Sequence, residues 1–365
     1  RVNRLFAERL APLLRDDDLV WVHDYHLIPL AAELRRMELR QPLGFFLHIP
    51  FPHIEALRAL PVYAEIVRDL VQYDLVGFQT ARDLECFRSA VAEVLGPAAL
   101  RPDGSIQAGG RRTRVGVFPI GVDVDEIQRE SRSSLSSETV RRMCDGLLGR
   151  RCIIGVDRLD YSKGLVDRFQ AYERYMEACP DSHNHVTFLQ IAPLSRADLR
   201  TYAEIRRSLE QTAGRINGRF AETDWTPIRY LNRNYSHEVL MGFLRNADVG
   251  VVTPMRDGMN LVAKEYIAAQ DPDDPGVLVL STLAGAAEEL SSALLVNPRD
   301  TRGVAEAIQR ALAMPLEERR SRHTEQLAVL RRNDIHAWHS RFVDALQACV
   351  RPAIVAPPRL QANVR

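Results

Sequence analysis

The stretch that decides the fold is residues 247–270, which read ADVGVVTPMRDGMNLVAKEYIAAQ. Between Val249 and Val252 it is a β-branched run of the kind that forms a buried parallel strand, and Pro254 ends this run. Residues 262–270 contain neither glycine nor proline and predict a helix. The loop 256–261 therefore lies at the carboxyl end of a strand, where open α/β sheets bind their ligands.

This loop and the start of its helix offer two kinds of polar group to a ligand. The first backbone N–H groups of a helix have no partner within it and carry a partial positive charge, which suits a phosphate. About one turn into the helix, Glu265 is placed to accept hydrogen bonds from the hydroxyls of a ribose. A plain strand-loop-helix unit with a solvated glutamate explains this stretch equally well, so the other loops must decide between the two interpretations.

Composition excludes several classes of protein. The chain has 365 residues, of which 26% are charged and 46% hydrophobic, and this is typical of a globular protein large enough for two domains. Its 48 basic and 48 acidic residues cancel, so we expect neither a nucleic acid nor a membrane as a partner. The five cysteines are scattered without a CxxC pair, which predicts reduced thiols and a cytoplasmic location.

The first part of the chain alternates between predicted strands and helices. Apolar runs predict strands at 19–22, 43–47, 75–78 and 115–118, and amphipathic spacing predicts helices at 2–14, 30–36 and 54–71. Glycine-containing turns at 102–104 and 109–110 predict a hairpin before the last of these strands. Together the strands predict a parallel sheet with polar residues gathered at the strand ends.

A second alternating set follows the serine-rich run 131–137, which we interpret as a linker. Its predicted strands are 152–156, 186–191, 228–231, 249–252, 277–280 and 293–296. Such a series is typical of a doubly wound sheet, so we expect an α/β protein with two Rossmann-like domains facing each other across a cleft. The predicted domains are 1–130, 138–335, and a C-terminal helix and tail at 336–365 that packs back on the first domain.

Two further loops at predicted strand ends carry cations. In the loop 158–164, RLDYSKG, Arg158 and Lys163 could together hold a diphosphate leaving group. The loop 192–196 adds Arg196, which could hold a phosphate. Taken singly, each cation is more simply a surface residue, but their occurrence beside the loop that precedes Glu265 favours a ligand site.

The histidines allow more than one interpretation. The spacing of His23 and His26 suits a metal, but no third ligand of the zinc type stands near them in the sequence, so a metal is the weaker interpretation. His48 lies between an apolar strand and two prolines, where a buried core histidine is the plainer explanation. Its position at a strand end favours a hydrogen bond to a substrate instead.

Several of these stretches resemble the signature sequences of trehalose-6-phosphate synthases. They are WVHDYHL at 21–27, FFLHIPFP at 45–52, RLDYSKG at 158–164 and RDGMNLVAKEY at 256–266. The resemblance extends to AGRING at 213–218 and PGVLVLS at 275–281, in the same order and spacing, and covers nearly the whole chain. It implies a retaining glycosyltransferase of the GT-B fold, which moves glucose from a nucleotide sugar, usually UDP-glucose, to glucose 6-phosphate. The product would be α,α-trehalose 6-phosphate.

The resemblance also implies a role for each matching residue. It makes the catalytic group Asp24, His48, Arg158, Lys163 and Asp257. It assigns donor binding to Arg158, Lys163, His48 and Asp257, to Gly258, Met259, Asn260 and Leu261, and, on the ribose, to Glu265. Asp24 and Arg196 face the acceptor, with Arg196 on its phosphate. Because the cations and the helix N–H groups stabilise the departing diphosphate, neither a metal nor a cofactor is implied.

The resemblance fails at the start of the chain. Members of the family begin with a strand and a glycine-rich loop over the donor phosphates, and with an arginine and aromatic residues of the acceptor site, none of which precedes Arg1. We therefore expect a fragment with an incomplete first domain and little activity of its own. Two alternatives stay open: a transferase with another acceptor, such as glycerol 3-phosphate or a cyclitol phosphate, and a non-catalytic nucleotide-sugar-binding module. The sequence also leaves a homo-oligomer open.

Overall fold

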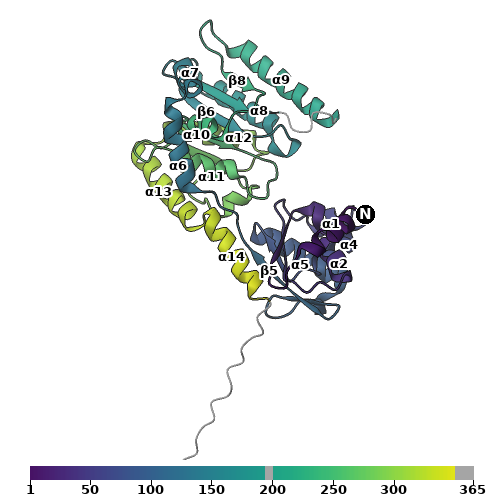
Figure 1. Ribbon diagram of the computed structural model, residues 1–365. Helices are drawn as coiled ribbons and strands as arrows, with labels where there is room; N and C mark the ends of the chain where they lie inside the picture. The colour runs from purple at the N-terminus through teal and green to yellow at the C-terminus, as the bar shows by residue number, and fades with distance from the viewer. Residues whose placement is uncertain (194–199, 350–365) are drawn as a thin grey trace, which may run out of the picture. The chain divides into compact units, whose positions relative to one another are not determined.

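The chain divides into two compact units (Figure 1). The computed structural model describes residues 1–193 and 200–349, and of residues 200–202 it describes the backbone alone. Of the described residues, the first unit contains 1–118 and 339–349, whereas the second contains those between 119 and 338. Each unit has its own sheet and its own hydrophobic core.

The sheet of the first unit has five strands in the order β1-β2-β3-β5-β4. The first four strands in this order are parallel, and β4 pairs antiparallel with β5, which confirms both the predicted parallel sheet and the predicted hairpin. The strands are β1 (Val20–His23), β2 (Leu43–Phe46), β3 (Leu75–Phe78), β4 (Ile106–Ala108) and β5 (Arg111–Val117). The helices are α1 (Val2–Leu10), η1 (Ala11–Leu13), η2 (Tyr25–Leu27), α2 (Leu30–Arg36), α3 (Ile54–Leu57), α4 (Tyr63–Leu70), α5 (Ala81–Leu95) and η3 (Pro97–Ala99).

Proline interrupts two of the helices predicted in this unit. The segment predicted as one helix over 54–71 forms two, α3 and α4, because Pro61 lies between them and cannot continue a helix. The first helix likewise ends at Leu10 and continues as the 3-10 turn η1, which has Pro12 near its start. The helix predicted at 30–36 has those bounds as α2.

The last helix of the described residues, α14 (Ile335–Gln347), explains why residues 339–349 belong to the first unit. The ring of Phe342 stacks on Trp21 of β1, with ring centroids 4.3 Å apart. It also covers Gly44 of β2 and Gly77 of β3, where an added Cβ would come within 2.8 Å of the ring. These glycines leave room for the aromatic ring on the face of the sheet.

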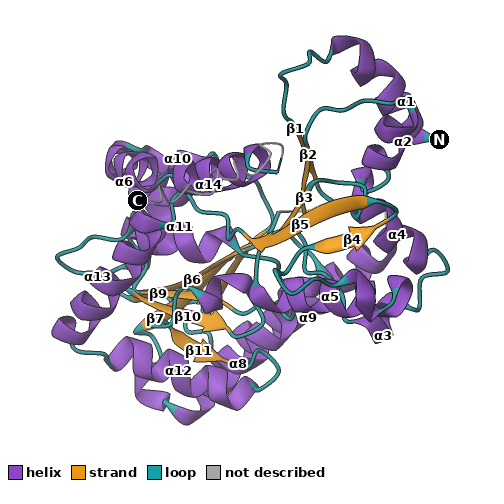
Figure 2. Ribbon diagram, turned by 90° about the horizontal axis from the view of Figure 1, so that it is seen from below, coloured by secondary structure: helices purple, strands orange, loops and turns teal. Residues whose placement is uncertain are grey.

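The second unit contains a six-stranded parallel sheet in the order β11-β10-β9-β6-β7-β8 (Figure 2). All the strands predicted in this part of the chain are confirmed, as β6 (Arg151–Val156), β7 (Val186–Ile191), β8 (Ile228–Leu231), β9 (Val249–Val252), β10 (Val277–Ser281) and β11 (Leu294–Val296). The order is that of a doubly wound sheet, and it reverses between β6 and β9. The loops that follow these two strands therefore meet at the switch point, where such sheets bind ligands.

Alternate residues along these strands enter two separate hydrophobic clusters. Ile154 and Leu189 belong to the cluster with α6, α10 and α11, whereas Ile153 and Phe188 belong to the cluster with α8, α9 and α12. The helices of the unit are α6 (Val124–Ser133), η4 (Ser134–Ser136), α7 (Glu138–Leu147), η5 (Tyr161–Lys163), α8 (Leu165–Ala178), η6 (Pro180–Ser182), α9 (Arg200–Phe220), α10 (His237–Arg245), α11 (Leu261–Ala269), η7 (Gly285–Glu288), α12 (Thr301–Ala313) and α13 (Leu316–Arg332).

The serine-rich run 131–137 is not a linker, contrary to the prediction. Ser131 lies in α6 and Ser134 in η4, and both side chains are buried. Ser134 packs so closely against Gly242 of α10 that a Cβ at Gly242 would have no room, which shows that small side chains serve close helix packing here. The first unit ends at Phe118 rather than at residue 130, because α6 packs on α10 and α11.

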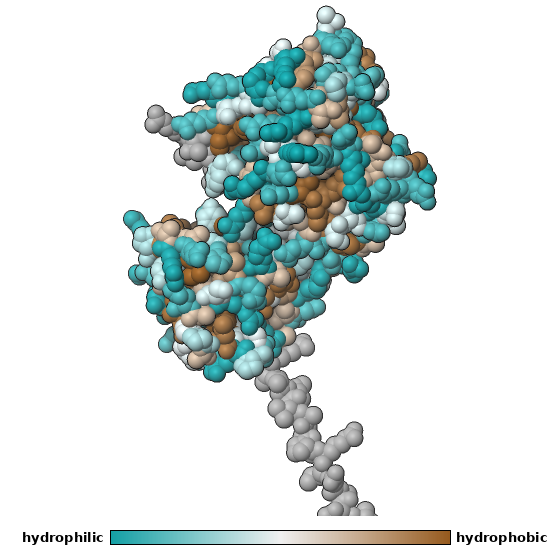
Figure 3. Space-filling model, turned by 180° about the vertical axis from the view of Figure 1, so that it is seen from behind, coloured by the Kyte–Doolittle hydropathy of each residue, from teal (hydrophilic) through white to brown (hydrophobic). Residues whose placement is uncertain are grey.

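On the face shown in Figure 3, hydrophilic residues predominate and hydrophobic residues form smaller, separate areas. None of the helices in the described part of the chain combines the length and the apolar character needed to cross a bilayer.

Candidate active site

A buried arginine, Arg168, anchors the loop that follows β6. Arg168 of α8 is fully buried, and its guanidinium donates to Thr253 Oγ1 at 2.9 Å and to Gln190 Oε1 at 3.0 Å. It also pairs with Asp157, the first residue after β6. Arg168 thus ties together the carboxyl ends of β6, β7 and β9 and is not available to a ligand. Sequence reasoning missed it, since a lone arginine in an amphipathic helix is normally exposed.

Lys163 and Asp257 lie face to face at the switch point. Lys163 Nζ donates to Asp257 Oδ2 at 2.5 Å, and the two side chains are 14% and 19% exposed. The backbone joins the same two loops, since Met255 N donates to Ser162 O at 2.7 Å. Gly164 permits this approach, because its φ is +62° and an added Cβ would come 2.9 Å from a backbone oxygen. The loops after β6 and β9 therefore form one polar site.

Arg158 stands apart from this ion pair. Its side chain is exposed, and no carboxylate within the described residues pairs with it. The nearby Asp160 is engaged by Ser162, whose N–H and hydroxyl both donate to Asp160 Oδ1 at 2.9 Å. Arg158 is therefore a cation that an incoming diphosphate can engage without first breaking an ion pair.

The start of α11 follows in the same site. Asn260, with a φ of 74°, caps this helix by accepting from Ala263 N at 3.2 Å, and its Nδ2 donates to Asp257 Oδ2 at 3.0 Å. This cap satisfies the backbone N–H of Ala263 in the first turn. The backbone N–H of Leu261, the first helical residue, can then bind an anion. Met259 differs from its neighbours, since its side chain lies in the hydrophobic core and only its backbone can serve a ligand.

Glu265 lies in the second turn of α11, with its side chain 19% exposed. It faces His237 at the start of α10, whose Nε2 lies 3.9 Å from Glu265 Oε1. His237 Nδ1 also lies 2.5 Å from Glu130 Oε2 of α6. The carboxylates of Glu265 and Glu130 raise the pKa of His237 to about 9, so this imidazole is protonated at neutral pH. Neither His237 nor Glu130 was predicted, since each lies on a separate helix far from Glu265 in the sequence.

In the first unit, Asp24 combines a strained backbone with an unpaired carboxylate oxygen. It follows β1 with φ of 69° and ψ of 163°, a conformation that costs residues other than glycine about 1–3 kcal/mol. Its Oδ1 is buried and has no hydrogen-bond partner among the described residues. Together these features indicate a side chain that the fold holds ready for a ligand.

His48 lies in the same unit, two residues beyond β2, and its Nε2 is 3.0 Å from Nδ1 of His23. Burial lowers the pKa of both imidazoles, so both are neutral near pH 7 and one ring can donate a hydrogen bond to the other. His26 is not part of this pair and stacks on Tyr25, with ring centroids 3.8 Å apart. No cluster of three or more histidine, cysteine or acidic side chains in the described ranges is arranged to hold a metal ion.

The predicted site residues thus fall into two groups, one in each unit. The second unit brings together Arg158, Lys163, Asp257, Glu265 and the loop 258–261, and the first unit holds Asp24 and His48. Arg196 lies outside the described residues.

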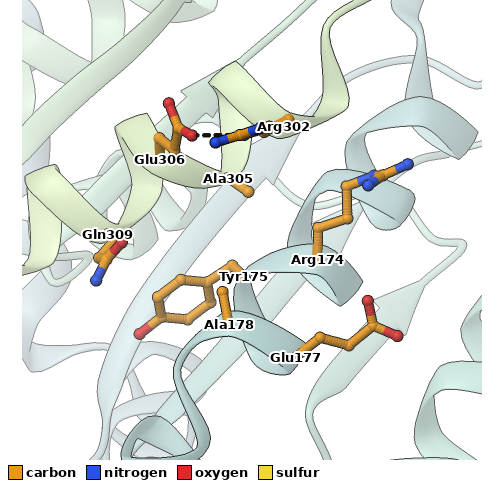
Figure 4. Close-up of a pocket in the computed structure, with 8 residues that line it drawn as sticks. All are labelled: Arg174, Tyr175, Glu177, Ala178, Arg302, Ala305, Glu306 and Gln309. Carbon is orange, nitrogen blue, oxygen red and sulfur yellow. Dashed lines mark hydrogen bonds and ion pairs between the residues drawn. The ribbon is translucent and has the colours of Figure 1, made fainter.

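A hollow of about 410 Å³ between α8 and α12 contains none of the predicted residues (Figure 4). Two arginines and two glutamates are among its lining residues, and Arg302 Nε pairs there with Glu306 Oε1 at 2.9 Å. Since its cations are matched by an equal number of carboxylates, it does not compete with the switch point as a diphosphate site.

Comparison with known proteins gives a match to glycosyltransferase family 20 over residues 1–348. The chain belongs to this family. Like other family 20 members it is a glycosyltransferase, as the resemblance predicted. It is 51% identical over 347 residues to the trehalose-6-phosphate synthase of Klebsiella pneumoniae, a match that covers 95% of this chain and 73% of that protein.

Solved structures of trehalose-phosphate synthases agree with this assignment. A UDP-forming synthase from Burkholderia vietnamiensis is 53% identical, with a TM-score of 0.93 over 96% of this chain and 79% of that one. The synthase of Burkholderia xenovorans in complex with glucose-6-phosphate is 52% identical, with a TM-score of 0.92 over 95% and 77% of the two chains. The Escherichia coli protein bound with UDP-2-fluoro glucose is 48% identical, with a TM-score of 0.90 over 95% and 77%. The predicted α/β fold of the GT-B type is confirmed.

Proposed function

We propose that this family 20 chain transfers glucose from UDP-glucose to glucose 6-phosphate, giving α,α-trehalose 6-phosphate and UDP with retention at the anomeric carbon. The relatives that were crystallised with glucose-6-phosphate and with UDP-2-fluoro glucose support this substrate pair. They favour glucose 6-phosphate over glycerol 3-phosphate or a cyclitol phosphate, and a catalytic chain over a binding module.

The observation that carries the proposal is the meeting of two loops at the switch point of the second sheet. A nucleoside diphosphate needs cations for its phosphates and an acceptor for its ribose hydroxyls. The exposed Arg158, the ion-paired Lys163 and the amino end of α11 supply the first requirement within one unit. Glu265, in the second turn of the same helix, supplies the other.

The cations act on the leaving group. Negative charge develops on the diphosphate as its bond to glucose breaks, and Arg158 and Lys163 stabilise this charge more strongly than that of the bound substrate. A positioned group that meets developing charge in this way contributes about 3 kcal/mol to transition-state stabilisation. We propose that the departing phosphate oxygen takes the proton of the acceptor hydroxyl on the same face of the sugar, which retains the anomeric configuration.

The side chains of the first unit are proposed to bind sugar hydroxyls. Asp24 has a buried oxygen without a partner among the described residues, and a hydroxyl of the acceptor would supply the missing donor. His48 is proposed to bind a hydroxyl of the donor glucose, with the neutral imidazole of His23 fixing the orientation of its ring. Arg196 is proposed for the acceptor phosphate.

We also propose a cytoplasmic location. All five cysteines lie within the described part of the chain, and none of them forms a disulfide. Free thiols of this kind are expected in a reducing compartment.

Calorimetric titration of the chain with UDP, GDP and ADP tests the nucleotide site. We expect UDP to bind, and the combined change of Arg158→Ala and Lys163→Met to abolish the binding. Arg174→Met, which removes an exposed cation from α8, is the matched control and should bind like the wild type. If the folded chain binds none of the three nucleotides, or binds them equally well without both cations, the proposed site is wrong.

Product analysis tests the acceptor. The chain is incubated with UDP-glucose and either glucose 6-phosphate or glycerol 3-phosphate, and the glycosylated products are identified by NMR. Turnover is expected to be low, and we expect the glycosylated product of the first mixture to be α,α-trehalose 6-phosphate. A product with glycerol 3-phosphate alone would refute the proposed acceptor while leaving the nucleotide site intact.

A further inference from the structure

Glu265 belongs to a row of three ionisable side chains contributed by three helices of the second unit. Glu130 of α6 lies 2.5 Å from Nδ1 of His237, and Nε2 of His237 lies 3.9 Å from Glu265 of α11. The side chains of Glu130 and Glu265 are 26% and 19% exposed, and that of His237 is 51% exposed. The histidine is thus held between two carboxylates that are far apart in the sequence.

We propose that His237 is a positioning residue for the nucleotide ribose, which holds the carboxylate of Glu265 turned toward the ribose hydroxyls. Glu130 fixes the imidazole from the other side. This inference rests on the proposed function, because it takes Glu265 as the acceptor of the ribose hydroxyls.

The positive charge of His237 suits it to this role. A nucleoside bound over α11 removes water from Glu265, and burying a carboxylate is costly unless a charge stays paired with it. The imidazolium, with its Nε2 3.9 Å from Glu265 Oε1, offsets part of this cost and favours one orientation of the side chain. When the imidazolium loses its proton, this orienting attraction is lost as well.

A third acidic residue, Glu238, lies next to His237 on its own helix. Glu238 follows it in α10, but Glu238 Oε1 accepts a hydrogen bond from Ser133 Oγ at 2.8 Å. The groups that face His237 are therefore Glu265 from α11 and Glu130 from α6, and both raise its pKa, to about 9. The imidazolium charge is fully present at pH 7 and is lost as the pH rises through this value.

The experiment compares UDP with its 2′,3′-dideoxy analogue by calorimetry, using the whole chain and its His237→Ala, His237→Gln, Glu238→Gln and Glu265→Gln variants. The affinity for UDP divided by the affinity for the dideoxy analogue reports the ribose contacts alone. Any titration of the uracil ring affects both ligands equally and cancels in this ratio. We expect His237→Ala to lower this ratio roughly three- to fivefold, the scale of a half-exposed ion pair. Glu238→Gln, next in the chain, should leave the ratio unchanged.

The pH profile separates positioning from a merely structural effect. In the wild type the ratio should fall as the pH rises from 8 to 10, because this range contains the pKa of His237, which is about 9. In His237→Ala the ratio should stay constant over the same range. His237→Gln keeps a hydrogen-bond donor without the charge, so its ratio should also be flat and should lie between the other two. Circular dichroism establishes that each variant is folded.

Failure of this inference differs from failure of the proposed function. If Glu265→Gln lowers the ratio while both His237 variants leave it at the wild-type value, Glu265 binds the ribose without help from His237 and the inference is wrong. If the wild type does not bind UDP, or does not distinguish it from the dideoxy analogue, the ribose site itself is wrong and the inference falls with it.

Discussion

Lys163 and Asp257 are 94 residues apart in the sequence and form an ion pair at 2.5 Å, although each of them is proposed to bind the donor. In the free protein each of these charges is already partly neutralised by the other. A diphosphate that arrives at Lys163 therefore competes with Asp257, whose carboxylate then needs another donor. A hydroxyl of the donor glucose can supply this hydrogen bond, whereas free UDP carries no glucose.

Asp257→Asn should therefore act oppositely on UDP and on UDP-glucose. We expect UDP to bind more tightly by about 1 kcal/mol, because a carboxylate beside the diphosphate disfavours a second negative charge. UDP-glucose should lose a charge-assisted hydrogen bond worth about 1.5–3 kcal/mol. Calorimetry with both ligands measures the difference, and equal changes for the two would show that Asp257 does not contact the donor sugar.

Arg168→Met should strongly destabilise the second unit. The change leaves Asp157, whose side chain is 2% exposed, without its cation, and breaking a buried pair in this way costs about 3–5 kcal/mol. It should also weaken UDP binding, because Arg168 Nη2 donates to the backbone oxygen of Lys163 at 3.4 Å. Urea unfolding gives the change in the free energy of unfolding.

Arg174→Met is the matched control for this experiment, since Arg174 is an exposed arginine on the same helix. Such surface changes usually stay within about 0.5 kcal/mol. Similar free energies of unfolding for the two variants would mean that the buried network around Arg168 contributes nothing to stability.

The sequence predicts those parts of the fold that are determined by residues close together in the chain. The strands of the second unit are short apolar runs bounded by polar residues, so β6 to β11 could be placed within a residue or two. The loops 158–164 and 256–261 meet because parallel strands end at a common edge, which follows from topology alone.

The parts that the sequence does not predict depend on distant partners. Ser131 and Ser134 have the composition of a linker, but they are small residues packed against α10. Arg168 is buried because Asp157, Gln190 and Thr253 converge on it, and no spacing within α8 indicates this. The row from Glu130 to Glu265 likewise depends on how three helices pack, which no local pattern specifies.

Stability of the second unit should fall in mild acid because of His323. This side chain is buried, its Nε2 lies 3.0 Å from Ile267 O, and burial lowers its pKa below the usual 6.5. The unfolded chain binds a proton at His323 as the pH falls through about 6.5, whereas the folded chain does not, so folding loses stability below that value. Above it both states are neutral and the contribution is constant.

His323→Gln should reduce this dependence on pH, since glutamine does not titrate and can still donate to the carbonyl of Ile267. Urea unfolding at pH 7.5 and pH 5.5 measures the loss of stability in each protein. His53→Gln is the control, because His53 is 64% exposed. If His323→Gln loses as much stability as the wild type between these pH values, the acid sensitivity has another origin.

Gly121→Ala should destabilise the second unit more than any change of one methyl group on its surface. A Cβ at Gly121 would overlap the backbone oxygen of Asn333 and backbone atoms of Asp334, which cannot swing away as the end of a side chain can. We expect a loss of about 3 kcal/mol in the free energy of unfolding, at the upper end of the range for overpacking.

Gly214→Ala in α9 is the matched control, since nothing lies within 4 Å of its added Cβ. Alanine should stabilise that helix by up to about 1 kcal/mol. Urea unfolding of both variants measures the change in the free energy of unfolding that each substitution causes. Equal shifts in the same direction would mean that the segment at 333–334 can move away from Gly121 at no cost, and that the close contact between these two stretches does not hold the unit together.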